Sequence, residues 1–196
     1  MAEIGARVIG SREVHAGRVV NLRLEEVELP NGRRTTLEII HHPGAAVVVP
    51  LLESGEVLLV RQYRHATGGD WLLEVPAGTL NAGEAPEACA ARECAEEVGF
   101  RPRKLVPLGY LWTTPGFTDE RIWIFLGLGL EPVRQKLDED EMLTVERRPF
   151  SEALALALAG GIDDGKSIAA LVRAAAHCGV ELPAAGGSAP LSRSSL

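Results

Sequence analysis

The sequence predicts an α/β protein in which a small β unit precedes one compact domain. Strand-like apolar runs and segments with helical periodicity alternate between residues 45 and 180, which indicates the main domain. Residues 1–44 show strand-like alternation and a hairpin turn but no helical period, which indicates the separate β unit. With 196 residues, 46% of them hydrophobic, the chain can bury a substantial core.

The expected β unit has two alternating stretches, RVVNLRLEEVEL at residues 18–29 and TTLEII at residues 35–40. Asn31-Gly32 between them is typical of a tight hairpin turn. A sheet this small cannot fold alone, so we expect it to pack on the main domain or on a second subunit. The second alternative predicts a homodimer that forms through this unit.

The main domain is expected to begin with two apolar runs, residues 45–52 and 57–60, which resemble central strands buried on both faces. A further strand at residues 71–80 is interrupted by a proline. A helix is expected from Pro86 to Val98, because proline suits the first helical turn and Gly99 suits a helix end. The remaining elements are expected in this order: strands at 105–113 and 121–130, a strand around 143–148, helices at 151–161 and 166–179, and a disordered tail at 181–196.

The composition excludes several classes of partner. The net charge is −7, with 27 acidic and 20 basic residues, so no broad basic surface for nucleic acid is expected. No apolar run approaches the roughly 20 residues of a membrane-spanning helix, and the N-terminus does not resemble a signal peptide. These features predict a cytoplasmic protein without a membrane partner. The three cysteines lack zinc-type spacing and are expected to be reduced: Cys89, Cys94 and Cys178.

The stretch ARECAEEVGF at residues 91–100 places three carboxylates on the expected helix. At about 100° per residue, Glu93, Glu96 and Glu97 share an arc of roughly 100°, so they form one negative stripe. Arg92 can pair with Glu96 four residues later, which leaves Glu93 and Glu97 together without a cation. One interpretation is a solvated acidic face, and the other is a site for a divalent ion such as Mg2+.

The spacing around this helix favours the metal site. The stretch from Gly78 to Phe100 matches the pattern GX5EX7REUXEEXGU, in which U is an apolar residue, and it therefore resembles the signature of the nudix hydrolases. The resemblance implies an α/β/α sandwich with a mixed sheet. It also implies that two or three Mg2+ ions, for which Mn2+ can substitute, hold a diphosphate that is linked to another group.

The same resemblance assigns roles to individual residues. Glu93 and Glu97 would be the main metal ligands, and Glu96 would bind a metal directly or through water. The carbonyl oxygen of Ala77 would be a further ligand. The residues that shape the loop and the helix would be Gly78, Glu84, Arg92 and Gly99.

Three further stretches are similar to the ADP-ribose pyrophosphatase subgroup: VRQYR at residues 60–64, LLEVPAG at residues 72–78 and TTPGFTDE at residues 113–120. In the third stretch, Pro115 lies 16 residues after Gly99. This resemblance implies Mg2+-dependent hydrolysis of ADP-ribose to AMP and ribose 5-phosphate. The alternatives are hydrolysis of other nucleoside diphosphate sugars, GDP-mannose among them, and a non-catalytic domain that senses ADP-ribose.

Substrate-binding residues are expected outside the signature. Arg64 and Arg61 would reach the diphosphate, because a guanidinium group can bind two phosphate oxygens, although Arg61 also fits a surface charge at a strand end. Glu120 would approach the terminal ribose or pair with a neighbouring base. Pro115 would contact the substrate or form an ordinary turn. The tryptophans are expected in the core: Trp71, Trp112 and Trp123.

The acidic loop LDEDEM at residues 137–142 is the expected source of the group that accepts a proton from the attacking water. Alignment with the catalytic loop of the subgroup points to Glu139, with Glu141 next. The alternative interpretation is a flexible, solvated loop. Glu97 would contribute to catalysis through its metal ion.

Overall fold

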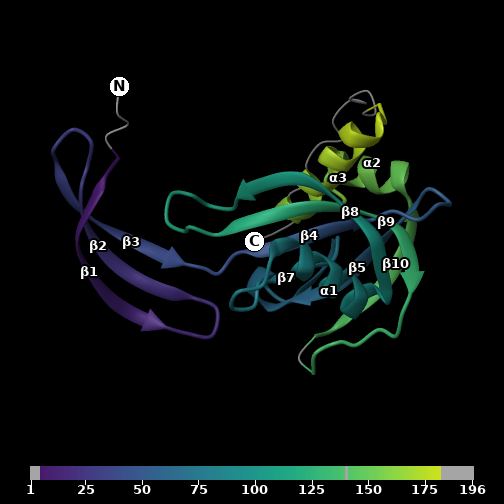
Figure 1. Cartoon of the computed structure of the whole chain (residues 1–196), viewed down its shortest axis with the longest axis horizontal. Coiled ribbons are helices and arrows are strands. Elements are labelled where there is room, and N and C mark those ends of the chain that lie inside the picture. Colours follow the sequence, from purple (N-terminus) through teal and green to yellow (C-terminus); the bar gives the residue numbers. More distant parts are fainter. Residues whose placement is uncertain (1–4, 140, 182–196) are drawn as a thin grey trace.

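The main domain and the N-terminal β unit are both present in the computed structural model, which describes residues 5–139 and 141–181 (Figure 1). Apart from its first position, the tail expected at residues 181–196 lies outside the described residues. Within the described part of the chain, no helix combines the length and the hydrophobicity that crossing a bilayer requires.

The first sheet of the main domain is mixed. Strand β4 (Ala45–Pro50) runs parallel to β9 (Arg121–Pro132) at the centre of the sheet. Two antiparallel strands complete it, β7 (Ala77–Thr79) beside β4 and β8 (Phe100–Trp112) beside β9. The order is therefore β7-β4-β9-β8, which confirms the mixed sheet expected from the sequence.

The second sheet is antiparallel, with β5 (Glu56–Arg64) between β6 (Asp70–Glu74) and β10 (Leu143–Pro149). A single 3₁₀ turn, η1 (His65–Thr67), follows β5. The strand expected at residues 71–80 is divided at Pro76, where the chain passes from one sheet to the other. Proline cannot donate a hydrogen bond to a strand ladder, so it suits this crossing point.

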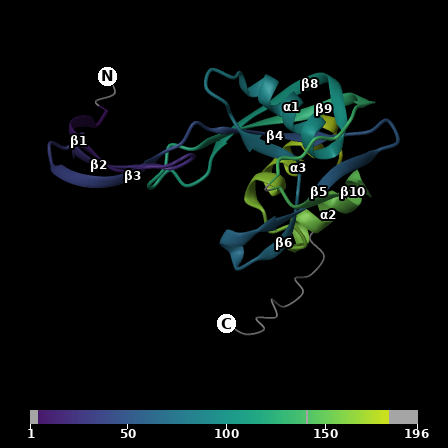
Figure 2. The same ribbon diagram turned by 90° about the horizontal axis from the view of Figure 1, so that it is seen from below.

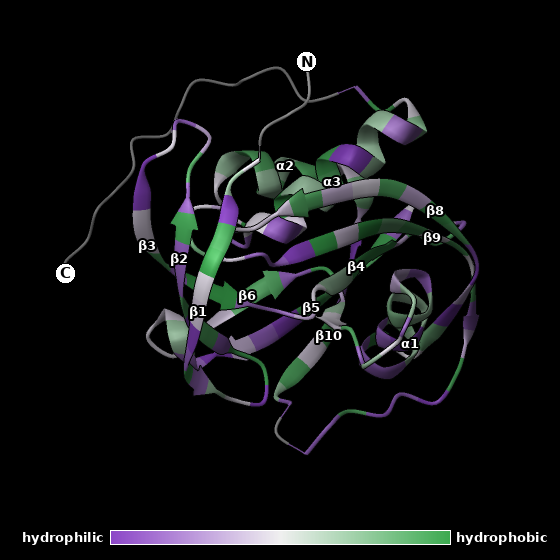
Figure 3. Ribbon diagram, turned by 60° about the vertical axis from the view of Figure 1, so that its left-hand side comes forward, coloured by the Kyte–Doolittle hydropathy of each residue, from purple (hydrophilic) through white to green (hydrophobic). Residues whose placement is uncertain are grey.

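Three α-helices cover the sheets: α1 (Pro86–Val98), α2 (Phe150–Ala159) and α3 (Gly165–Cys178). Successive residues of β4 face different cores, because side chains alternate along a strand. Val48 packs with α1, whereas Val47 packs with α2 and α3. In Figure 3 the hydrophobic segments of β4 and β9 lie between α1 on one side and the other two helices on the other. The α/β/α sandwich is therefore confirmed.

The N-terminal β unit is an antiparallel sheet of β1 (Arg7–Ala16), β2 (Asn21–Glu28) and β3 (Arg34–His41). Figures 1 and 2 both show that it projects away from the main domain. Strand β1 adds to the two stretches expected from the sequence. Its register shifts twice against β2, and such bulges break the alternation that marks a strand in a sequence.

The N-terminal sheet buries little hydrophobic surface within this chain. Among the described hydrophobic residues of its strands, Val27 is the only one that is buried, whereas Val8, Ile9, Val14 and Leu37 are exposed. A second subunit could cover these side chains. The homodimer through this sheet stays a prediction.

The end of β3 is fastened to the loop between β8 and β9. His41 Nδ1 lies 2.6 Å from Asp119 Oδ2, and the backbone N–H of His42 donates to Asp119 Oδ1 at 2.8 Å. The other ring nitrogen of His41 lies 3.1 Å from Glu25 Oε1 on β2. His41 therefore connects a carboxylate of the N-terminal sheet with a carboxylate of the main domain.

The connection through His41 predicts a pH-dependent contribution to stability. The hydrogen bond with Asp119 raises the pKa of His41 above 6.5, and Glu25 adds to it, although burial opposes both. The contribution is therefore fully present below pH 6.5 and is lost as the pH rises through the folded-state pKa. We expect His41→Gln to lower the free energy of unfolding more near pH 6 than near pH 9, as measured by urea denaturation. An equal loss at both pH values would contradict this expectation.

Candidate active site

Two of the three carboxylates among the predicted metal ligands are buried against the mixed sheet. Helix α1 spans Pro86–Val98, the range expected from the sequence, and ends at Gly99. Glu93 is 7% exposed and Glu97 is 1% exposed, whereas Glu96 is only partly buried. The interpretation of a fully solvated acidic face is therefore wrong for Glu93 and Glu97.

Arg92 contacts more carboxylates than the sequence predicted. The expected ion pair with Glu96 is present at 3.1 Å, but the same Nη1 atom also lies 2.6 Å from Glu93 Oε1. The expectation that Glu93 would be left without a cation is therefore wrong, because the guanidinium reaches its sequence neighbour as well as the next turn. Arg92 also donates to both oxygens of Glu84 at 2.8 and 2.9 Å, which fixes the loop before α1. This contact lowers the pKa of Glu84 to about 2.

The backbone of β7 lies directly against the two buried carboxylates. A Cβ atom at Gly78 would lie 1.8 Å from Glu93 Oε1, so only glycine allows this approach. The backbone N–H of Ala77 donates to Glu97 Oε2 at 3.2 Å. Ala77 and Gly78 therefore bring a backbone segment beside the carboxylates, as the signature predicts.

The surroundings of Glu93 and Glu97 disfavour the negative charges of the two carboxylates. Burial raises the pKa of Glu93 to about 7, and it raises the pKa of Glu97 well above 4.5. The charge of Glu93 raises the pKa of Glu97 further, and Glu141 acts on both. A divalent cation would relieve this repulsion and restore the ionised forms.

The donor chemistry of the site fits a hard divalent ion. Carboxylate oxygens are the ligands that Mg2+ prefers, and it commonly uses one or two of them while keeping several waters. Among residues 5–139 and 141–181, no three acidic, histidine or cysteine side chains converge as a ready-made metal site. Arg92 instead engages Glu93 and Glu96, and a backbone N–H engages Glu97. The three carboxylates that would bind Mg2+ therefore lie on one helix, and each of them is hydrogen-bonded to another group of the protein.

The segment between β9 and the acidic loop is hydrogen-bonded to the C-terminal end of α1. The side-chain Nε2 of Gln135 donates to the carbonyl of Glu97 at 2.5 Å, and the backbone N–H of Val133 donates to the carbonyl of Gly99 at 2.8 Å. Gly99 has a φ of 71°, which a residue with a side chain rarely adopts. The contact of Gln135 could not be predicted from the sequence, because a single glutamine in a polar loop belongs to no recognisable motif.

The two candidate proton acceptors of this loop differ in their surroundings. Glu141 is partly buried, its carboxylate accepts from the backbone N–H of Asp138 at 3.1 Å, and its charge raises the pKa values of Glu93 and Glu97. Glu139 is exposed. Of the two candidates, Glu141 is therefore the one whose charge acts on Glu93 and Glu97.

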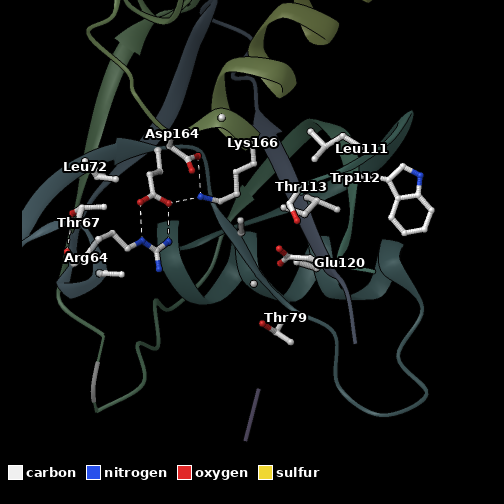
Figure 4. Close-up of a pocket in the computed structure, with 17 residues that line it drawn as sticks. Arg64, Thr67, Leu72, Thr79, Leu111, Trp112, Thr113, Glu120, Asp164 and Lys166 are labelled. Atoms are coloured by element: carbon white, nitrogen blue, oxygen red, sulfur yellow. Dashed lines mark hydrogen bonds and ion pairs between the residues drawn. The ribbon is translucent and has the colours of Figure 1, made fainter. Parts of the chain in front are cut away.

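A pocket of about 680 Å3 opens beside the strand β7 (Figure 4). Ala77 and Gly78 form part of its wall, and the predicted substrate-binding residues Arg64 and Glu120 also line it. A volume in this range suits a small-molecule ligand. The structure therefore brings the predicted metal loop together with two of the four predicted substrate-binding residues.

The other two predicted substrate-binding residues do not line this pocket. Arg61 Nε donates to Glu146 Oε1 at 2.5 Å across the pair of β5 and β10. Arg61 therefore lies inside β5, paired with both neighbouring strands, and not at a strand end as the alternative interpretation held. Pro115 is exposed in the loop between β8 and β9. Roles of Arg61 and Pro115 in substrate binding stay predictions.

The expectation that the tryptophans lie in the core is wrong for two of the three. Trp71 is 44% exposed and Trp112 is 42% exposed, because both lie near strand ends that the helices do not cover. Trp123 packs partly against the core beside α1. The guanidinium of Arg121 lies 4.5 Å from the ring centroid of Trp112, which is also at the rim of the pocket.

Three further charged residues line the pocket, and none of them was predicted as a site residue: Glu74, Asp164 and Lys166. Glu74 lies at the end of β6 and is 1% exposed, and Lys166 lies in the first turn of α3. The signal for Glu74 was present in the sequence, since a charged residue inside the apolar stretch LLEV predicts a buried ion pair. Lys166 carried no comparable signal.

Several known proteins are similar to this chain in sequence or in fold. Residues 40–171 match the NUDIX domain family. The chain is 36% identical over 173 residues to the ADP-ribose pyrophosphatase of Bacillus subtilis (strain 168), covering 87% of this chain and 93% of that protein. It is 38% identical over 175 residues to the ADP-ribose pyrophosphatase of Mycobacterium tuberculosis (strain H37Rv), covering 88% and 84%. A solved ADP compounds hydrolase has a similar fold, with a TM-score of 0.77 at 23% identity over 90% of this chain and 97% of that chain.

The matched range contains the mixed sheet, the signature helix α1 and the pocket beside β7. The alignments with the two bacterial relatives extend over most of both chains. The protein therefore belongs to the NUDIX domain family, and the family that the signature predicted is confirmed.

The burial of Glu97 predicts how the protein responds to Mg2+. Near pH 8 in EDTA, we expect Glu97→Gln to raise the free energy of unfolding, because it removes a buried carboxylate that Glu93 repels. Mg2+ at 100 times its dissociation constant should stabilise the wild type by about 2.7 kcal/mol and the variant much less. Urea denaturation with and without Mg2+ measures both effects. The control is Glu87→Gln, an exposed acid of the same helix. An undiminished Mg2+ effect in Glu97→Gln would refute the metal assignment.

Proposed function

We propose that the protein is a nudix hydrolase that cleaves the diphosphate linkage of ADP-ribose to give AMP and ribose 5-phosphate, with Mg2+ as its cofactor. The observation that carries this proposal is the pair of buried carboxylates, Glu93 and Glu97, that lies against the backbone of β7 at the edge of the pocket. The names of the two bacterial relatives support ADP-ribose as the substrate.

The helix α1 and the strand β7 would hold the metal ions. Glu93 and Glu97 would be the main ligands, Glu96 would bind directly or through water, and the carbonyl of Ala77 would complete the set. When bound, Mg2+ would neutralise charge on the diphosphate oxygens and lower the pKa of the attacking water. Ion binding also requires the guanidinium of Arg92 to share Glu93 and Glu96 with the metal. Two or three ions are expected, and Mn2+ can substitute.

The pocket would position the rest of the substrate. Arg64 lines the pocket and would donate hydrogen bonds to phosphate oxygens. Glu120 lines the same pocket, where its carboxylate would accept hydrogen bonds from the hydroxyl groups of the terminal ribose. These contacts would align the phosphorus atom with the attacking water.

Proton transfer completes the reaction. The water oxygen attacks one phosphorus atom, the bridging P–O bond breaks, and a carboxylate takes the proton that the water loses. We propose Glu141 for this step and keep Glu139 as the alternative, because the charge of Glu141 reaches Glu93 and Glu97. The anchoring of the loop by Gln135 supports the placement of this carboxylate beside α1.

The function is tested by AMP release from ADP-ribose. We expect purified protein to release AMP and ribose 5-phosphate only when Mg2+ or Mn2+ is present, and to have its highest kcat/KM for ADP-ribose. Product chromatography on a panel of ADP-ribose, ADP-glucose, GDP-mannose and FAD measures this preference. A higher kcat/KM for GDP-mannose would favour the alternative substrate. Tight binding of ADP-ribose without release of AMP would instead favour a non-catalytic sensor.

The proton acceptor is tested by a matched pair of variants in one loop. We expect Glu141→Gln to lower kcat for ADP-ribose by about 100-fold or more and to change KM little, because the substituted amide cannot accept the proton. Glu139→Gln, which alters an exposed acid two residues away, should retain most activity. The reverse result in steady-state kinetics would assign the role to Glu139.

A further inference from the structure

Two cationic side chains at one end of the pocket share a single buried carboxylate. Arg64 donates from Nε and Nη2 to the two oxygens of Glu74 at 2.8 and 2.7 Å. Lys166 Nζ donates to Glu74 Oε2 and also to Asp164 Oδ2, the latter at 2.9 Å. In Figure 4 the nitrogen atoms of Arg64 and Lys166 lie close together, and dashed lines mark the hydrogen bonds and ion pairs of both side chains. Glu74 therefore sets the spacing between Arg64 and Lys166.

The shared carboxylate stays ionised although it is 1% exposed. Burial alone would raise the pKa of Glu74, but the hydrogen bonds from Arg64 and the charge of Lys166 outweigh burial and lower it. The four charges of the cluster, those of Arg64, Lys166, Glu74 and Asp164, sum to zero. The cluster is therefore stable without a ligand, and any selectivity it has must come from the direction of its N–H groups.

Several N–H groups of this cluster remain available at the wall of the pocket. A guanidinium has five N–H donors and an ammonium has three. Arg64 uses two of its donors on Glu74, and Lys166 uses one each on Glu74 and Asp164. Among the described residues, three donors of Arg64 and one of Lys166 have no side-chain acceptor. Both residues line the pocket, so these donors can reach an anionic ligand there.

The position of Lys166 is fixed relative to the metal-binding loop. Asp164 caps α3 by accepting the backbone N–H of Ser167 at 3.0 Å. The hydroxyl of Ser167 in turn accepts the backbone N–H of Val75 at 2.9 Å, and Ser167 is fully buried. Val75 lies two residues before Ala77, the first residue of β7. The N-terminus of α3 is thereby tied to the segment that leads to the candidate metal site.

We propose that Lys166 and Arg64 together form a phosphate subsite that binds one phosphoryl group of the diphosphate without a metal ion. Lys166 is then a substrate-binding residue that lies outside the nudix signature. The inference rests on the proposed function for the identity of the diphosphate. Helices α1 and α3 pack on opposite faces of the mixed sheet, so a diphosphate at β7 has Glu93 and Glu97 on one side and this subsite on the other.

The test is phosphate binding in EDTA, where the metal cannot contribute. Calorimetry with inorganic pyrophosphate and with ADP-ribose gives the dissociation constants. Lys166→Met, which keeps the length of the side chain but removes its charge, should weaken both by about tenfold or more, because a charge-assisted hydrogen bond is lost. Lys166→Arg should retain most of the affinity. The matched control is Lys104→Met, which removes an exposed lysine of β8 and should change neither constant.

Two results would overturn the subsite. One is wild-type affinity in a folded Lys166→Met variant, and the other is a wild-type protein that binds neither compound in EDTA. If Lys166→Met fails to fold, Glu74→Gln and the double variant Glu74→Gln/Lys166→Met replace it, because the buried charge is then absent from both. The double variant should bind about tenfold more weakly than Glu74→Gln alone, and equal binding would overturn the proposal.

The same variants separate this inference from the proposed function. With Mg2+ present, Lys166→Met should raise KM for ADP-ribose more than it lowers kcat, because the lost contact serves binding. A wild-type protein that releases AMP together with undiminished pyrophosphate binding by Lys166→Met leaves the function intact and overturns the subsite. Absence of AMP release together with Lys166-dependent pyrophosphate binding overturns the function and supports the subsite.

Discussion

Two carboxylates buried four residues apart on one helix are the constraint on which the rest of the site depends. Glu93 and Glu97 repel each other in a setting where water cannot screen them, so their ionised forms need a cation nearby. Arg92 supplies positive charge to Glu93, Glu84 and Glu96, whereas within the described part of the chain the carboxylate of Glu97 accepts a hydrogen bond from the backbone N–H of Ala77 and from no side chain. A divalent ion would relieve the repulsion between Glu93 and Glu97. This gain would favour ion binding even though the site offers few ligands.

The candidate metal-binding loop and the charged cluster of the pocket are supported by two different sheets. Pro76 divides what would otherwise be one strand, so that Glu74 ends β6 in the antiparallel sheet and Ala77 begins β7 in the mixed sheet. Only two residues, Val75 and Pro76, therefore separate Glu74 of the charged cluster from Ala77 of the candidate metal-binding loop. Glu74 and Ala77 are each hydrogen-bonded within a sheet. The distance between the charged cluster and the candidate metal-binding loop is therefore set by the two sheets and not by a flexible loop.

Local signals account for what the sequence predicted well. The helix at Pro86–Val98 was predicted with its bounds, because a proline start and a glycine end act within a few residues. The exposure of Trp71 and Trp112 was not predictable in this way, since it depends on which strand ends the helices cover. Contacts across long separations were equally hidden, as Lys166 and Glu74 lie 92 positions apart. Glu139 and Glu141 could not be separated by pattern, because only the folded loop determines which carboxylate approaches α1.

Two consecutive residues of the loop between β8 and β9 face different parts of the molecule, the N-terminal sheet and the pocket. Asp119 holds His41 at the base of the N-terminal sheet, and the next residue, Glu120, lines the pocket. Because the two residues are adjacent in the chain, a displacement of Asp119 would also displace the backbone of Glu120. A partner that binds the N-terminal sheet would therefore act on a loop that also forms part of the pocket wall.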